Sequence, residues 1–483
     1  MFMKRNLYSN IDINTVVRPF LDRAAAQDPS APAVLYPFVD LYEGTAVTDV
    51  LFCVFCQYSA VDSVWWTTYR DKFLQKEENG VPVDYTAEYG ALCAFHDRGV
   101  DPYEVWFRRC REKGLRPWLS VRMNDSHCNT EDASFLRSEF HYEALRKGWM
   151  VGEKYGYFHR NYDYAVPEVR RRMLGYLEEQ LSRYDVDGLE LDFQRELTCF
   201  DYLNRTDCCE IMNEFLRSVR AAVRRAEARL GHPVRLGVRL MRDVDQNRIY
   251  GFDAETWVRE GLVDLLIPSP RWETNDSDMP VADWKRRFPD VEIAAGLTDL
   301  FLRNLPEMGC SPALMRGCAV RYLADGADSI YLYNFFQDPG APDPRFDEIN
   351  RTCGNLETAS SLPFRHMVTL QDSIPLGSEG WVPLPLRNGA VTVRMGYIPE
   401  GRRSAVLAAL EGGDPVSSDL RVNGLALPFA PCDRGLAEAE TPNSYVPGNS
   451  VLYRAELPPD AGDTFTVSLS GPASLTYLEA EVL

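Results

Sequence analysis

Eight short apolar runs recur between residues 33 and 334, and patterns typical of helices separate most of them. The runs predict strands over residues 33–39, 50–56, 117–123, 188–193, 235–241, 263–268, 291–296 and 329–334. Residues 167–184 illustrate the intervening pattern, because a proline opens the stretch and apolar residues then recur with a helical period of about 3.6. Eight buried strands joined by helical crossovers are typical of an α/β (β/α)8 TIM barrel, which we expect over residues 1–356.

An open doubly wound sheet would show a similar alternation. No glycine-rich phosphate fingerprint follows the first run, which disfavours a dinucleotide-binding domain. Beyond residue 357 the pattern changes to short alternating runs such as 390–395 and 464–469, separated by Gly, Pro, Asn and Asp. We expect residues 357–483 to form an accessory antiparallel β-sandwich domain that serves packing or sugar binding.

Charge and composition limit the partners. The formal net charge of -19 would repel phosphates, so we expect no nucleic-acid partner and no binding to anionic membranes. No window reaches the roughly 18 apolar residues of a membrane span, and the first residues lack the apolar stretch of a signal peptide. The 12 cysteines are scattered without framework spacing, as in a reducing compartment. We expect a cytoplasmic protein and leave a homo-oligomer open.

The fourth run places acids inside the predicted barrel. A strand buried on both faces normally reads as nearly continuous apolar residues, yet Glu190 and Asp192 occupy every second position here. Burying these carboxylates costs free energy unless other groups pair with them, so such acids commonly mark a functional site. The alternative is an internal hydrogen-bond network that only supports the barrel.

Active sites of such barrels lie at the C-terminal ends of the strands. In this chain those ends are polar. They carry Asp40 after the first run, Gln57 after the second, Arg122, Asn124, Asp125 and His127 after the third, Asp192, Gln194 and Arg195 after the fourth, Arg239 and Arg242 at the fifth, Arg271 after the sixth and Asn334 after the eighth.

Several arginines at one end of an acidic protein need anions to satisfy them. Some of them can pair with the acids of the barrel, and a guanidinium fork also binds a substrate carboxylate bidentately. A carboxylated sugar is therefore favoured over a neutral one. The six histidines are widely spaced and no ligand spacing occurs, so we expect no metal and no cofactor.

His127 is the histidine that follows a predicted strand end. Its side chain can exchange protons near neutral pH, and Asp125 or another acid can orient it. The alternative is a histidine with a purely structural role. A tyrosine nucleophile from Tyr58, Tyr331 or Tyr333 is a further alternative, although packing or stacking is the commoner role of such residues.

The strand at residues 187–194, DGLELDFQ, resembles the DGxDxDxE strand of chitinase-type glycoside hydrolases. It departs from that pattern at its last position, where Gln194 is an amide that cannot donate a proton as the family's glutamic acid does. The chitinase mechanism is therefore not transferable. Either the acid lies elsewhere or the protein is inert.

Arg122, His127, Arg195 and Asn334 together resemble the inverting exosialidase family, glycoside hydrolase family 156. The motifs RMND at residues 122–125 and DGLELD at residues 187–192 also resemble those of family-10-like glycosyl hydrolases. The resemblance covers the barrel and implies release of terminal sialic acid from a sialylated glycan. It implies that His127 and Asp40 transfer protons. The substrate-binding residues would be Arg122, Asn124, Glu190, Asp192, Arg195, Arg239 and Asn334.

Two other functions stay open at this point. One is a glycosidase that acts on uronic or neutral sugars, with Glu190 or Asp192 as its acid. The other is a catalytically silent carbohydrate-binding barrel, which the amide at Gln194 favours.

Overall fold

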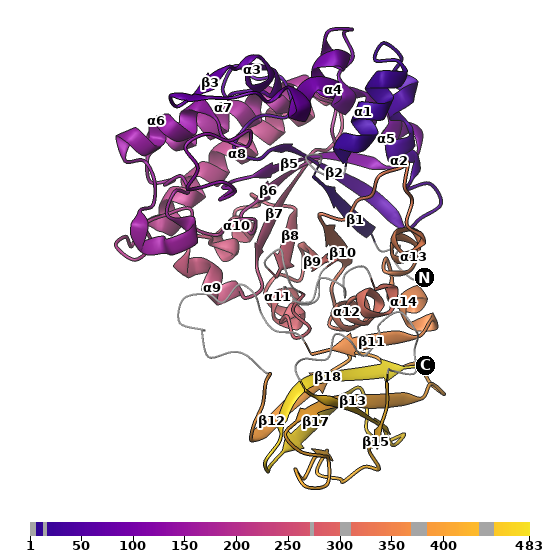
Figure 1. Cartoon of the computed structure of the whole chain (residues 1–483). Coiled ribbons are helices and arrows are strands. Elements are labelled where there is room, and N and C mark those ends of the chain that lie inside the picture. Colours follow the sequence, from indigo (N-terminus) through magenta and orange to yellow (C-terminus); the bar gives the residue numbers. More distant parts are fainter. Residues whose placement is uncertain (1–5, 13–16, 271–274, 300–310, 369–383, 434–448) are drawn as a thin grey trace.

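The computed structural model describes residues 6–12, 17–270, 275–299, 311–368, 384–433 and 449–483. Eight parallel strands form a closed barrel in the order β1-β10-β9-β8-β7-β6-β5-β2 (Figure 1). Their bounds are β1 Asn6–Ile11, β2 Val47–Phe55, β5 Arg116–Arg122, β6 Gly188–Asp192, β7 Arg235–Met241, β8 Leu265–Ser269, β9 Glu292–Thr298 and β10 Ser329–Tyr333. The predicted TIM barrel is therefore confirmed.

Helices surround the barrel and connect its strands (Figure 1). They are α1 Val17–Gln27, η1 Pro32–Leu35, α2 Pro37–Asp40, α3 Tyr69–Leu74, α4 Thr86–His96, α5 Pro102–Glu112, α6 Glu139–Lys147, η2 Glu153–Phe158, α7 Pro167–Arg183, α8 Cys208–Leu230, α9 Val244–Ile249, α10 Ala254–Arg259, α11 Val281–Arg287, α12 Pro312–Ala324, α13 Pro344–Thr352 and α14 Leu356–Ser361. A short hairpin, β3 Glu77–Glu78 and β4 Val81–Pro82, lies between α3 and α4.

The first predicted strand was wrong. Residues 33–39 lie in the helical turns η1 and α2, and a proline stands at the start of each. Proline has a fixed φ and no N–H, which suits the first turn of a helix, and Phe38 then packs its ring 5.1 Å from Trp106. The strand that closes the barrel is instead β1, which pairs with both β2 and β10.

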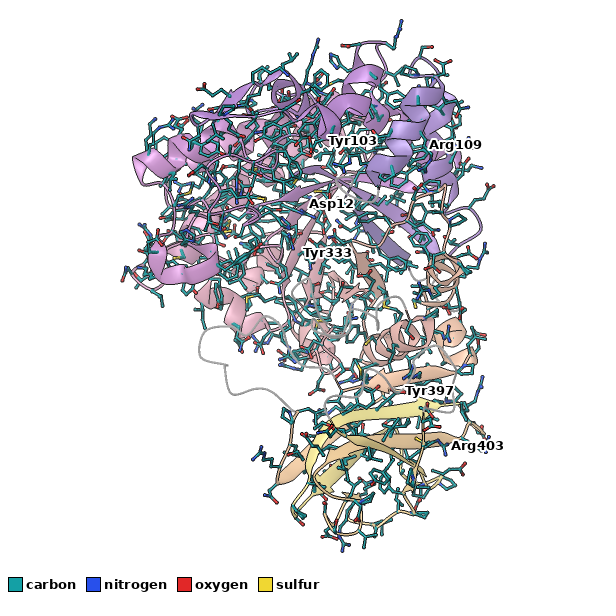
Figure 2. The ribbon with its side chains drawn as sticks, in the orientation of Figure 1. Asp12, Tyr103, Arg109, Tyr333, Tyr397 and Arg403 are labelled. Carbon is teal, nitrogen blue, oxygen red and sulfur yellow. The ribbon has the colours of Figure 1, made fainter. Side chains whose placement is uncertain are left out.

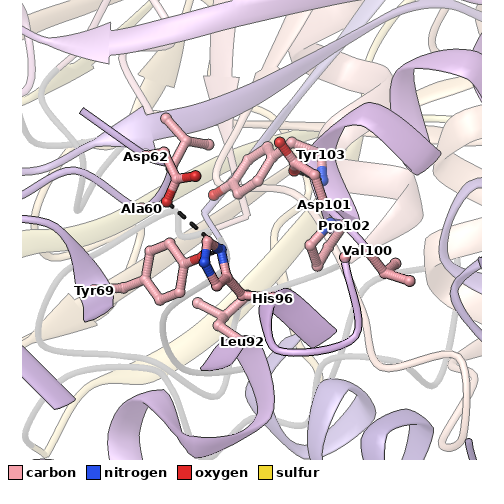
Figure 3. Close-up of a pocket in the computed structure, with 11 residues that line it drawn as sticks. Ala60, Asp62, Tyr69, Leu92, His96, Val100, Asp101, Pro102 and Tyr103 are labelled. Carbon is pink, nitrogen blue, oxygen red and sulfur yellow. Dashed lines mark hydrogen bonds and ion pairs between the residues drawn. The ribbon is translucent and has the colours of Figure 1, made fainter. Parts of the chain in front are cut away.

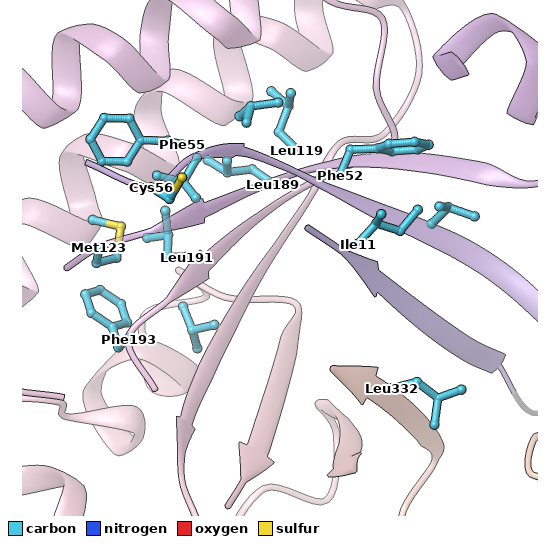
Figure 4. Packing of buried hydrophobic residues seen from close by; sticks show 14 of the residues in the cluster. Ile11, Phe52, Phe55, Cys56, Leu119, Met123, Leu189, Leu191, Phe193 and Leu332 are labelled. Atoms are coloured by element: carbon cyan, nitrogen blue, oxygen red, sulfur yellow. The ribbon is translucent and has the colours of Figure 1, made fainter. Parts of the chain in front are cut away.

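The interior of the barrel is filled in layers, because side chains at alternate positions of each strand point inward. Near the N-terminal ends of the strands, Trp118 is fully buried beside Gly188, where a Cβ would stand 2.2 Å from the indole ring. The next layer holds Ser120 and Glu190, which are partners in the register of β5 and β6. The outward-facing residues of the same strands pack against the helices (Figure 4).

The segment from Met123 to Val166 follows β5 and contains α6 and η2. Arg137, whose side chain is buried, holds its beginning in place. The guanidinium group donates to the main-chain oxygens of Asp125, His127 and Cys128. The main chain of the turn that carries His127 is thus held in place by the side chain of Arg137.

The C-terminal part of the chain forms separate antiparallel sheets. One has the order β11-β18-β13-β16-β15 and the other β12-β17-β14. Their bounds are β11 Phe364–Met367, β12 Gly389–Arg394, β13 Ser404–Glu411, β14 Arg421–Val422, β15 Ala430–Pro431, β16 Val451–Glu456, β17 Thr464–Leu469 and β18 Ser474–Val482. The two sheets share one hydrophobic cluster. Antiparallel sheets are therefore confirmed here, whereas the sandwich form and the boundary at residue 357 stay predictions.

The first of these sheets lies directly against the barrel. At Gly317 of α12, a Cβ would stand 1.9 Å from the main-chain oxygen of Arg365 in β11, so only glycine permits this approach. Among the described residues, no helix combines the length and the apolar character that crossing a membrane requires.

Candidate active site

Three charged side chains form a row at the C-terminal end of the barrel. Arg122 pairs in register with Asp192, and Asp192 with Arg239, so the three lie on neighbouring strands β5, β6 and β7. Arg239 Nη1 is 3.0 and 3.1 Å from the two oxygens of Asp192, and its guanidinium lies 3.5 Å from the centre of the Tyr333 ring. All of these side chains are buried. Asp192 is therefore the partner of Arg239 inside the barrel.

Asp125 and His127 form a hydrogen-bonded pair just beyond β5. The ring Nδ1 of His127 lies 2.6 Å from Asp125 Oδ1, which also accepts the main-chain N–H of His127 at 2.9 Å. Burial would raise the pKa of Asp125, but His127, Arg195 and Arg122 together hold that pKa well below its usual range. An ionised carboxylate only accepts, so Nδ1 carries the proton of this hydrogen bond. The side chain of His127 is 39% exposed, so the rest of the ring is within reach of a ligand.

Arg195 joins the same group from the loop after β6. Its Nη2 lies 2.6 Å from Nε2 and 3.1 Å from Nδ1 of His127, and its Nε lies 3.7 Å from Asp125 Oδ2. Its main-chain N–H donates to Asp192 Oδ1 at 2.8 Å. The predicted set of His127, Arg122 and Arg195 thus meets in one place.

Asp12, which was not predicted from the sequence, adds a second carboxylate next to Arg122. Asp12 follows β1, and its Oδ2 accepts a hydrogen bond from Arg122 Nη2 at 2.7 Å. The Asp12 side chain is 15% exposed. Figure 2 shows Asp12, which follows β1, and Tyr333, which ends the neighbouring strand β10. The signal for Asp12 would have been an acid directly after a short strand near the N-terminus.

Asp40 does not join this group, and its predicted position after a barrel strand was wrong. It ends α2 on the outer ring of helices, where both of its oxygens accept from Arg109 of α5 at 2.7 and 2.9 Å (Figure 2). Asp40 therefore joins two helices.

Glu190 lies one layer deeper than the row of arginines. It accepts hydrogen bonds from Tyr331 at 2.5 Å and Asn10 at 3.1 Å, and it is fully buried. Burial and the nearby charge of Asp192 raise the pKa of Glu190 to about 7. Glu190 is therefore part of a hydrogen-bond network inside the barrel, as in the alternative of a network that supports the barrel.

The two predicted asparagines have different surroundings. Asn124 is fully buried, and its amide spans the main chain of Tyr162 and Thr198. It therefore joins the loops after β5 and β6. Asn334 has φ 48° at the end of β10, and its Oδ1 lies 3.4 Å from Arg122 Nη2. It belongs to the arginine group.

Several buried polar atoms at this end of the barrel have no hydrogen-bond partner within the described part of the chain, among them Gln57 Oε1, Gln194 Oε1 and the hydroxyl of Tyr333. The amide nitrogens of Gln57 and Gln194 donate to main-chain oxygens of Asp125 and Ser269. Buried acceptors normally find a donor, so these oxygens suit a ligand that carries hydroxyl groups.

Two further arginines, Arg242 and Arg271, were predicted at this end of the barrel. Arg242 pairs with Asp276 and donates to the main chain of Asp278 at 2.7 Å. Arg271 lies outside the described residues. Over the described ranges, no three His, Cys, Asp or Glu side chains gather as a metal ion requires.

A separate cavity of about 320 Å³ lies away from these residues, among the loop after β2, α4 and the start of α5 (Figure 3). His96 and Asp62 face each other there, with 3.7 Å between His96 Nδ1 and Asp62 Oδ1. The hydroxyl of Tyr69 lies 3.1 Å from the same ring nitrogen and forms a hydrogen bond with it. The second ring nitrogen of His96 contacts Arg70, so both nitrogens of His96 have partners within the protein.

No protein-family model matches the chain, and no curated protein sequence matches it. Solved structures are similar to it at low identity. An α-L-fucosidase isoenzyme 2 from Paenibacillus thiaminolyticus is 12% identical with a TM-score of 0.46, over 81% of this chain and 51% of the fucosidase. A family GH18 chitinase from Chromobacterium violaceum is 9% identical with a TM-score of 0.38, over 99% and 88% of the two chains.

A GH138 enzyme targeting pectin rhamnogalacturonan II is 9% identical with a TM-score of 0.39, over 73% of this chain and 48% of that enzyme. The chain thus spans about half the length of the fucosidase and of the GH138 enzyme. At these identities and TM-scores the likeness carries no argument about activity.

Proposed function

We propose that this protein is a glycoside hydrolase whose substrate is a sugar bearing a carboxylate, and specifically an exo-acting, inverting sialidase. The observation that carries the proposal is the meeting of the Asp125–His127 pair with the guanidinium groups of Arg122 and Arg195 at the C-terminal end of the barrel. Active sites of this fold lie at that end. Guanidinium groups bind carboxylates, and an aspartate-bound histidine is suited to move a proton near neutral pH.

In the proposed reaction, His127 Nε2 takes a proton from a water molecule. The water oxygen bonds to the anomeric carbon as the bond from that carbon to the leaving oxygen breaks. The electron pair goes to the leaving oxygen, which takes a proton from solvent. Asp125 stabilises the imidazolium that forms.

Asp12 takes the place that the sequence assigned to Asp40. A carboxylate at the end of β1, beside Arg122, is suited to stabilise the positive charge that develops on the sugar ring in the transition state. Glu190 is engaged inside the barrel and Asp192 is paired with Arg239, which argues against either residue as the acid of a neutral glycosidase.

The test is hydrolysis of a panel of aryl sialosides, aryl uronides and neutral aryl glycosides by the full chain, with product stereochemistry followed by NMR. We expect turnover of the sialosides with inversion. Turnover of uronides alone would overturn the sialidase form, and turnover of neutral glycosides alone would overturn the carboxylate requirement. Binding of the panel without any turnover would show a silent carbohydrate-binding barrel.

A further inference from the structure

Arg137 is a fully buried cation, and among the described residues no Asp or Glu forms an ion pair with it. Its guanidinium group donates instead to oxygens of the turn at residues 125–129. It reaches the main-chain oxygens of Asp125 at 3.2 Å, Cys128 at 3.3 Å and His127, and Oδ1 of Asn129 at 2.9 Å. A buried charge without a counter-charge is costly, so these oxygens are what compensates the charge of Arg137.

The turn that Arg137 contacts contains a left-handed residue. Cys128 has φ 54°, a conformation that residues other than glycine adopt only at a cost in free energy. Such a conformation persists where the surrounding contacts fix it, and the main-chain oxygen of Cys128 accepts from Arg137 Nε. His127 directly precedes Cys128, so a relaxation at Cys128 would turn the main chain that carries the His127 ring.

The pairing of His127 with Asp125 depends on this main chain. Asp125 Oδ1 accepts both the ring Nδ1–H of His127 at 2.6 Å and its main-chain N–H at 2.9 Å, across two residues of the turn. Arg137 donates to the main-chain oxygen of each of these two residues. One side chain therefore fixes the main chain on both sides of the pair.

Arg137 starts from a fixed base. Its main-chain N–H donates to the main-chain oxygen of Ser134 at 3.0 Å, and that oxygen also accepts from Lys72 Nζ at 3.0 Å. The main-chain N–H of Ser134 donates to Glu78 at 3.1 Å. Lys72 and Glu78 form a fully buried ion pair of 2.6 Å. The segment that carries Arg137 is thus attached to a buried ion pair between α3 and β3.

We propose that Arg137 is a positioning residue for His127: it holds the turn at residues 125–129 in its left-handed form, so that the His127 ring keeps its hydrogen bond with Asp125. This inference rests on the proposed hydrolase function. Arg122 and Arg195, which would bind the substrate carboxylate, lie outside this turn. Loss of Arg137 should therefore lower kcat much more than it raises KM.

The experiment measures kcat and KM for an aryl sialoside in the wild type, in Arg137→Met, and in Arg137→Met combined with Cys128→Gly or with Cys128→Ala. We expect Arg137→Met to lose about a hundredfold in kcat, the scale of a lost base, with KM within about threefold. Glycine adopts the left-handed conformation without steric cost, so Cys128→Gly should restore about tenfold of that loss. Alanine keeps the cost, so Cys128→Ala should restore less than about twofold.

Two results of this comparison would overturn the positioning role. One is a kcat of Arg137→Met within about twofold of the wild type. The other is an equal effect of Cys128→Gly and Cys128→Ala in the Arg137→Met chain, since only the conformational cost at residue 128 separates the two.

Arg316→Met is the matched control for stability. Arg316 of α12 is also buried and donates to a main-chain oxygen, that of Pro363, at 2.8 and 3.0 Å, outside the candidate site. Its replacement should lower the midpoint of urea denaturation and keep kcat within about twofold. A loss of kcat as large as that of Arg137→Met would show an effect of stability and would overturn the positioning role.

Arg137→Lys guards against misfolding of the Met variant. It keeps the buried charge, but a single ammonium nitrogen cannot reach several oxygens of the turn as the guanidinium fork does. We expect a loss of about tenfold in kcat, and again a larger recovery with Cys128→Gly than with Cys128→Ala. A kcat equal to that of the wild type would show that the charge alone suffices and would overturn the role of the fork.

A second measurement does not depend on turnover. The proton between His127 Nδ1 and Asp125 should give a downfield NMR resonance, which His127→Ala assigns. We expect this resonance to be lost in Arg137→Met and to return with Cys128→Gly. An unchanged resonance in Arg137→Met would overturn the positioning role. The expected changes of the resonance without hydrolysis of any sialoside would overturn the proposed function and leave the positioning of His127 intact.

Discussion

Asp12 and Arg122 come from strands on either side of β2 and are joined by a hydrogen bond of 2.7 Å at the C-terminal end of the barrel. The bond fixes the carboxylate next to the Asp125–His127 pair, since Arg122 Nη1 also donates to Asp125 at 3.0 Å. One guanidinium group therefore sets the relative positions of two acids and, through Asp125, of the histidine.

Replacement of Asp12 by asparagine should reduce kcat on an aryl sialoside by about a hundredfold, because the negative charge facing the developing positive charge is lost. Asp40→Asn is the matched control. It removes the same charge from the outer ring, where Asp40 pairs with Arg109 and Lys113, and should change kcat less than twofold. A large loss in Asp40→Asn with no loss in Asp12→Asn would contradict the assignment.

Replacement of Asp125 by asparagine should reduce kcat by a hundredfold or more. The amide can donate to Nδ1 of His127 and so place the proton on Nε2, the wrong nitrogen for a base. His127→Ala should give a loss of similar size. In the double variant the losses should not multiply, because the two side chains act as one unit. Steady-state kinetics on the four proteins checks this, and independent, multiplying losses would show separate roles.

Asn124→Ala should mainly affect stability. The amide of Asn124 satisfies main-chain groups of Tyr162 and Thr198 inside the protein, and its removal leaves them unpaired. We expect a loss of about 2–3 kcal/mol in the free energy of unfolding, measured by urea denaturation. KM for the sialoside should stay within about twofold. A strong rise in KM with unchanged stability would restore the substrate-binding role predicted from the sequence.

Glu190 should make the stability of the protein depend on pH. Its pKa in the folded protein is about 7, above the ordinary value of 4.5, because it is buried and Asp192 is close. The folded state therefore binds a proton that the unfolded state releases between these two values. The contribution of Glu190 to stability is complete below pH 4.5 and is lost as the pH rises through 7.

Glu190→Gln removes this dependence. We expect the wild type to lose about 1–3 kcal/mol of stability relative to Glu190→Gln between pH 5 and pH 8, since one pKa unit corresponds to about 1.4 kcal/mol. Denaturation curves of both proteins across this range measure the difference. A difference that is constant or has the opposite slope would show that the carboxyl is ionised throughout.

The sequence predicted most of the barrel because seven strands are apolar runs of the right length between helical patterns. It missed β1, Asn6–Ile11, because this strand buries Ser9 and Asn10, which read as polar. Asn10 is satisfied by Glu190 and Ser120, residues more than 100 positions away, and a pattern within six residues cannot reveal such partners. The stretch 33–39 was predicted as the first strand because it is apolar. Its apolar residues are buried against a helix and not in the barrel.

The residues of the candidate site were predicted correctly where the strands that carry them were predicted correctly. His127, Arg122 and Arg195 directly follow or end correctly placed strands, so their meeting follows from the fold. Asp12 was missed together with β1, and Asp40 was proposed because it followed the wrong stretch. The role of Asn124 could not be read from its position, because the end of a strand can face either the barrel axis or the loops that cover it.

The pairing of β1 with β10 has a consequence for the order in which this protein becomes functional. Residues 6–9 lie beside residues 329–332, so the barrel shuts only when chain segments more than 300 positions apart have met. Contacts of such separation form late and slowly. The barrel, and with it the part of the candidate site that Tyr333 forms beside Arg239, is therefore complete only after β10 has been synthesised.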